Sequence, residues 1–114
     1  MRSIAVIVAI AALSLPVHAL TPQAQEFMAV TKELEPVQCE KRRLRRELAL
    51  AEIEQRNEDL QKLRARFAAL DGDKKVVHLE RRLAELEPRV SKSSDPEDLA
   101  SISRQQREAF YRCD

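Results

Sequence analysis

The chain of 114 residues has one glycine, no tryptophan and only four aromatic residues. A single glycine excludes the glycine-rich loops that hold phosphate groups in nucleotide-binding proteins. The sequence also lacks the β-branched and aromatic runs, separated by glycine-rich turns, from which sheets are built. The abundant residues are Ala, Leu, Glu, Arg, Lys and Gln, which are strong helix formers. We therefore predict an all-α protein.

Histidine is equally scarce, and the only one beyond the first twenty residues is His78. Its neighbours four residues away are Lys74 and Arg82, so it forms no helical metal-binding pair. The many carboxylates alternate with Lys and Arg, which does not suggest a buried pair tuned for acid–base catalysis. We expect no metal, no cofactor and no enzymatic activity.

The chain has only one long apolar run, Ile4–Leu15, which follows a positively charged start. Val17 and Ala19 then occupy the positions that a signal peptidase requires to be small. A run of about 12 residues is too short to cross a bilayer, which needs roughly 20. We predict that residues 1–19 are a cleaved signal peptide. Residues 20–114 would form a single helical domain, periplasmic or secreted, with no transmembrane segment.

The sequence has no excess of either charge, with 20 basic and 19 acidic residues. Removing the predicted signal peptide takes away only Arg2, which leaves a neutral chain and argues against nucleic acid as the main partner. One dense cluster could dock another protein or an anionic envelope component. It could also be a solvated helix face balanced by neighbouring acids. The cluster comprises Lys41, Arg42, Arg43, Arg45 and Arg46.

The helix signals predict an elongated antiparallel hairpin. Thr21-Pro22 is a helix start, and Glu35-Pro36 should end this first helix because the residue before proline avoids the helical conformation. The next stretch contains neither Gly nor Pro, although its apolar stripe is interrupted by polar residues 55–59. Asp71-Gly72-Asp73 would be the turn of the hairpin. The expected elements are a short N-terminal helix over 22–34, a long helix over 37–70, and return helices over 74–88 and 96–112.

Cys39 and Cys113 are the only cysteines. In an oxidising compartment, an even pair indicates a disulfide. In a hairpin folded at Gly72 the outward and return paths are both about 48 Å long, which would bring the two cysteines together. A last helix that doubled back would instead leave Cys113 near the turn. An interchain bridge in a dimer and a redox-active pair remain alternatives to the intrachain disulfide.

The aromatic pair Phe110-Tyr111 lies next to Cys113. One interpretation packs Phe110 under the disulfide and leaves Tyr111 at its edge. The other joins both to Phe27 and Met28 in an exposed apolar end that contacts a partner.

Two short segments resemble known families. Leu20–Gln25 resembles the LTxxQ motif of the Spy-type periplasmic chaperones, which are helical cradles, with the glutamine one residue late. Gln105–Cys113 resembles the tail of secreted lysozyme-inhibitor-like helical domains, without their tryptophan. Neither resemblance carries over site residues, and we assign the chain to neither family.

These observations favour a non-enzymatic periplasmic hairpin that binds another macromolecule, as an adaptor or a weak chaperone. One alternative is a structural coiled-coil subunit that homodimerises through the apolar stripe of Ile53–Leu70. Another is a lysozyme-inhibitor-like secreted helical protein.

Overall fold

The computed structural model describes residues 20–93 and 95–113, so the predicted signal peptide lies outside the described residues. The described chain is helical throughout, with short connections and no strand, which confirms the all-α prediction. Its elements are α1 (Pro22–Ile53), α2 (Asn57–Gly72), α3 (Lys74–Ser91) and α4 (Pro96–Arg112).

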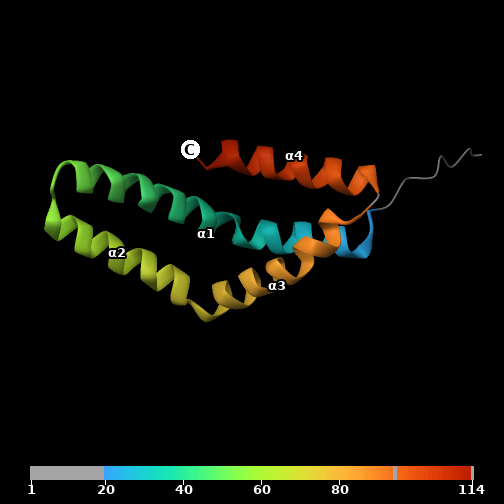
Figure 1. Ribbon diagram of the computed structural model, residues 1–114, viewed down its shortest axis with the longest axis horizontal. Helices are drawn as coiled ribbons and strands as arrows, with labels where there is room; N and C mark the ends of the chain where they lie inside the picture. Colours follow the sequence, from blue (N-terminus) through green and yellow to red (C-terminus); the bar gives the residue numbers. More distant parts are fainter. Residues whose placement is uncertain (1–19, 94, 114) are drawn as a thin grey trace, which may run out of the picture.

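The helices form an elongated hairpin with a third pass (Figure 1). The 32 residues of α1 span about 48 Å. Helices α2 and α3 follow one another back along α1, and α4 reverses again to run beside the first half of α1. One half of the molecule therefore has three helices across it and the other half has two.

The hairpin turn lies at residues 54–56, where the backbone N–H of Arg56 donates to the Ala51 carbonyl. Gln55 adopts a positive φ of 54°, which lets the chain reverse between α1 and α2. The predicted uninterrupted helix over 37–70 is therefore wrong. The polar interruption at 55–59 includes the turn itself, where no apolar side chain is needed.

The predicted break at Pro36 is also wrong, since Pro36 lies inside α1, and the helix expected to end at residue 88 continues past Pro88 to Ser91. Both prolines are exposed, so water can reach the carbonyl that each leaves without an amide partner. The short helix over 22–34 is thus the first part of α1. Gly72 is the last residue of α2 and has no positive φ, and only Asp73 separates α2 from α3. The chain does not reverse there.

The apolar side chains form two separate cores. The proximal core joins α1 to α3 and α4, and Leu34 and Leu86 within it are fully buried. Each such leucine contributes about 1.5–3 kcal/mol by leaving water. The distal core lies between α1 and α2 and centres on Leu44. Its other buried members are Ala51, Leu60 and Leu63, while those of the proximal core are Ala24, Phe27, Val30, Val76, Val90 and Ile102.

A buried carboxylate fastens the start of α4 to the start of α1. Asp98 is fully buried and accepts hydrogen bonds from the Thr21 backbone N–H at 3.0 Å and the Thr21 hydroxyl at 2.5 Å. The Ser93 hydroxyl donates to it at 3.2 Å. Thr21 caps α1, so the negative charge of Asp98 lies at the positive end of the helix dipole. This network sets the position from which α4 runs along α1.

Candidate functional site

Cys39 and Cys113 form an intrachain disulfide with their Cα atoms 5.2 Å apart. The predicted pairing is confirmed, but the path that leads to it is not the one expected. The last helix does double back, and it meets Cys39 because the hairpin turn lies at 54–56 rather than at Gly72. The disulfide therefore joins two helices that run in the same direction.

Helix α4 is attached to α1 at both ends and in its middle, where Gln105 Nε2 donates to the Met28 carbonyl at 2.8 Å. Its buried residues are Asp98 and Ile102, both in the first two turns. Its far end is held by the disulfide and by the Arg112 guanidinium, whose Nε donates to Glu35 at 2.8 Å. This hydrogen bond lowers the pKa of Glu35. The bridge thus positions the last turns of α4 on α1.

Beside the disulfide, Arg42 of α1 contacts Phe110 of α4. The guanidinium carbon lies 4.1 Å from the centre of the phenyl ring, and Nη2 donates to the Phe110 carbonyl at 2.9 Å. Arg42 and Phe110 are each three residues from a bridged cysteine, which puts them on the side of the helix that the bridge brings together. Phe110 stays 55% exposed and Tyr111 76% exposed, in an edge-to-face pair.

Lys41 has a different role from the rest of the basic cluster. Only 4% of the residue is exposed, and its ammonium lies 2.5 Å from Asp71 of α2 and 2.8 Å from Glu80 of α3. Burial alone would lower the pKa of Lys41, but the hydrogen bonds to the two carboxylates outweigh it and the pKa is raised. Lys41 therefore ties α1 to the junction of α2 and α3 and does not face a partner.

The remaining cations lie nearer the surface. Arg43 pairs with Glu40 on the same helix, and the Arg45 guanidinium lies 5.4 Å from the Phe67 ring. Arg45 and Arg46 are exposed, and Arg42 is half-buried under the contacts described above. We call the group formed by Arg42, Arg45, Arg46, Phe110 and Tyr111 the basic-aromatic surface.

A hollow of about 290 Å³ lies next to this surface, between α1 and α4. Arg42 and Arg45 line it from α1, and Phe110 lines it from α4. Two guanidinium groups beside an aromatic ring suit a carboxylate group, because Arg binds carboxylates through two parallel hydrogen bonds. Its polar lining also includes Thr31, Gln38, Gln106 and one acid, Glu35, whose carboxylate is paired with Arg112.

The proposed exposed apolar end does not form as one patch. Phe27 is a member of the proximal core, and Met28 is half-buried against that core. Both lie about three helical turns from Cys39, whereas Phe110 and Tyr111 lie beside the disulfide. The predicted homodimer stripe is also largely covered, since Leu60 and Leu63 are buried against α1. Of that stripe Ile53 remains well exposed, at 79%.

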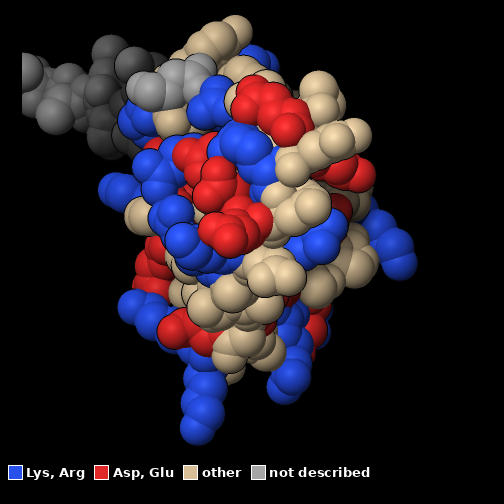
Figure 2. Space-filling model, turned by 90° about the vertical axis from the view of Figure 1, so that its left-hand side faces the viewer, with Lys and Arg blue, Asp and Glu red and all other residues tan. Residues whose placement is uncertain are grey.

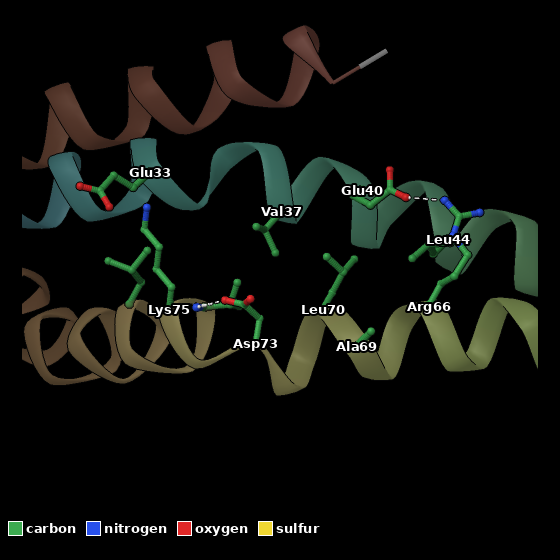
Figure 3. A pocket seen from close by; sticks show the side chains of 11 residues that line it. Glu33, Val37, Glu40, Leu44, Arg66, Ala69, Leu70, Asp73 and Lys75 are labelled. Carbon is green, nitrogen blue, oxygen red and sulfur yellow. Dashed lines mark hydrogen bonds and ion pairs between the residues drawn. The ribbon is translucent and has the colours of Figure 1, made fainter.

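A larger hollow of about 460 Å³ lies where α1 faces the junction of α2 and α3 (Figure 3). Its floor is apolar and includes Val37 and Leu70, which point toward one another across the gap. An ion pair between Glu40 and Arg66 borders it at 3.0 Å. The hollow separates the two cores and could accept an apolar side chain, but its rim has both charges and selects no particular ligand.

His78 is exposed on α3. Among residues 20–93 and 95–113, no three His, Cys, Asp or Glu side chains are grouped as metal ligands. None of the described helices is long and apolar enough to cross a membrane. Comparison of the chain with protein-family models, with curated proteins and with solved structures found no match.

Proposed function

We propose that this is an exported, non-enzymatic adaptor that docks an acidic segment of another protein on its basic-aromatic surface. The observation that carries the proposal is the contact between Arg42 and Phe110, which lie 68 residues apart in sequence. The disulfide holds this contact in place and leaves both aromatic rings open to solvent. A rigid group of this kind loses little conformational entropy when a partner binds.

The chemistry of the surface favours a protein partner. Arginine and tyrosine are enriched among the residues that contribute most to protein–protein binding. Arginine pairs with carboxylates in a fixed geometry, and the phenyl and phenol rings supply apolar area next to it. An anionic lipid surface would be attracted by the same charges, but it requires no particular arrangement of guanidinium groups. The ordered pairing of Arg42 with Phe110 therefore supports an acidic peptide over a membrane.

The test is the binding of a fluorescent peptide of alternating Glu and Tyr. Its affinity is measured by fluorescence anisotropy at about 50 mM and about 150 mM salt. We expect the triple substitution of Arg42, Arg45 and Arg46 to Gln to weaken binding at least about tenfold, which is about 1.4 kcal/mol. The matched control replaces three exposed cations of α3, Lys74, Lys75 and Arg81, by Gln and should bind like the wild type.

Equal weakening in both variants would show nonspecific attraction, and no binding by the wild type would exclude the proposal. Vesicles that contain about 30% anionic lipid form a separate arm. Tighter binding to these vesicles than to the peptide, lost in the triple variant of α1, would replace the acidic protein partner by a membrane surface.

A further inference from the structure

Helix α4 covers only the first half of α1, and no described helix covers the same face of α1 beyond the disulfide (Figure 1). Arg42, Arg46, Ala49 and Ile53 follow one another at steps of four, three and four, which places them along one helix face. The last three of these are exposed. The face ends at the hairpin turn, where Leu50 is also 51% exposed.

The large apolar residues that remain exposed fall mainly at the two ends of this face. Leu50 and Ile53 lie near the hairpin turn, and Phe110 and Tyr111 lie beside the disulfide. The first pair is thus carried by the turn end of α1 and the second by the basic-aromatic surface.

Basic and acidic residues occupy separate stretches of the sequence along the second half of α1 and the start of α2. Residues 41–46 contain five cations and no acid, whereas residues 47–59 contain five acids and one cation. The view onto the hairpin turn shows carboxylates near the centre of that end, interleaved with Lys and Arg side chains and beside uncharged ones (Figure 2). The second half of α1 therefore begins with a basic stretch and ends in an acidic one, although Lys41 is buried and Glu54 and Asp59 pair with Arg56. The acids are Glu47, Glu52, Glu54, Glu58 and Asp59.

We propose that a second copy of the chain docks on this face, with the second halves of the two α1 helices antiparallel about a twofold axis near Ala49. In an antiparallel pair, residues on the same side of the two helices face each other. Arg45 and Glu52 lie on the same side of the stripe, seven residues apart and about equally far from Ala49. Arg45 of each copy would then face Glu52 of the other copy. The small side chain of Ala49 lets the two backbones come close.

The arrangement is closed because the contacts are reciprocal. Arg42 and Ile53 are about 16 Å apart along α1. In an antiparallel pair, the Ile53 end of each copy can therefore contact the Arg42 end of the other copy at the same time. Each copy then places its turn end against the basic-aromatic surface of the other, which is the self-complementary interface of a twofold dimer. The inference rests on the proposed function, because it takes the basic-aromatic surface to bind an acidic segment and assigns that segment to a second copy of the chain.

Charge reversal tests the pairing directly, by sedimentation velocity from about 5 to about 200 μM at low salt. We expect wild-type dimers that dissociate as salt is raised. R45E and E52R should each be monomeric, because each puts like charges opposite one another. The double variant R45E/E52R and an equal mixture of the two single variants should both form dimers again. K75E on α3 is the control and should dimerise like the wild type.

A wild-type chain that stays monomeric at about 200 μM would overturn the dimer. So would single variants that dimerise, or a mixture that does not. A49W provides a second test, because the exposed position tolerates the ring in the monomer but blocks the close approach of two helices. The acidic-peptide assay separates the two proposals: a monomer that binds the peptide through Arg42, Arg45 and Arg46 loses only the dimer, whereas a monomer that does not bind it loses both.

Discussion

Cys39 and Cys113 each lie 17 residues beyond the first residue of their helix, Pro22 in α1 and Pro96 in α4. The two helices start at the same end of the molecule, where Asp98 of α4 accepts a hydrogen bond from Thr21, the capping residue of α1. Because both advance about 1.5 Å per residue in the same direction, the two cysteines arrive at the same level. The disulfide therefore fixes the register of α4 on α1, and with it the basic-aromatic surface.

The first prediction concerns the loss of this bridge in the double variant C39S/C113S. The closed loop spans 74 residues, so its removal should cost up to about 4 kcal/mol of unfolding free energy in the chain-entropy model. We expect the second half of α4 to exchange its amide hydrogens much faster, while the first half keeps part of its protection through Asp98 and Ile102. Urea unfolding and hydrogen exchange measure the two effects. Uniform exchange along α4 in the variant would show that the bridge does not set the register of its last turns.

The second prediction distinguishes the observed hairpin turn from the one at Gly72. Gly72 is helical with negative φ, and nothing lies within 4 Å of an added Cβ atom. Gly72→Ala should therefore stabilise the protein by about 0.5–1 kcal/mol. Gln55 has positive φ, where a side chain costs about 1 kcal/mol or more, so Gln55→Gly should also be neutral or stabilising.

Thermal unfolding of both variants measures these effects, and Gln55→Ala serves as a control that removes the side chain but keeps the Cβ atom. A turn at Gly72 with a left-handed glycine would make Gly72→Ala destabilising. That outcome would contradict the observed course of α2 and α3.

The sequence allowed the helical content, the starts of α1 and α4 and the disulfide pairing to be predicted, because each depends on local chemistry or on a count of two cysteines. Thr21 caps α1 as expected, and Asp95 caps α4, which begins at residue 96 as predicted. The hairpin turn was missed because Gln55 has no turn preference of the kind that glycine has, and tertiary packing imposes its conformation. Pro36 is a strong local signal for the end of a helix, but a long helix can accommodate a proline at an exposed position.

The candidate site was only partly predictable. The basic cluster and Phe110 are visible in sequence, but their contact depends on the register that the bridge imposes. A signal was present in the spacing, since Arg42 and Phe110 are each three residues from a cysteine. The different role of Lys41 within the basic cluster could not be predicted from the sequence, because only the fold places Asp71 and Glu80 around it.

The third prediction is a loss of stability in acid. A hydrogen bond from Arg82 lowers the pKa of Glu26, and one from Arg112 lowers the pKa of Glu35. The unfolded chain therefore binds protons at these carboxyls at a higher pH than the folded chain does. Their contribution is fully present above the ordinary value of 4.5 and is lost as the pH falls through the lowered values.

Circular-dichroism melting curves from about pH 7 to about pH 3 measure this dependence. We expect E26Q/E35Q to melt at a lower temperature than the wild type at neutral pH, and the difference to shrink in acid. The control E33Q/E87Q removes two exposed carboxylates that form no ion pair among the described residues, so it should follow the wild-type curve. A constant difference at every pH would mean that these ion pairs do not account for the acid sensitivity.

The fourth prediction concerns Lys41, whose ammonium bridges α2 and α3 from a buried position on α1. Lys41→Met keeps most of the apolar stem and removes both ion pairs. Breaking a buried ion pair typically costs 3–5 kcal/mol, but the side chains of Asp71 and Glu80 are 51% and 35% exposed and can be rehydrated. We therefore expect a loss of about 1–2 kcal/mol in urea unfolding. Lys74→Met, at an exposed position, is the control. Equal stability of the two variants would show that the junction between α2 and α3 is held by apolar contacts alone.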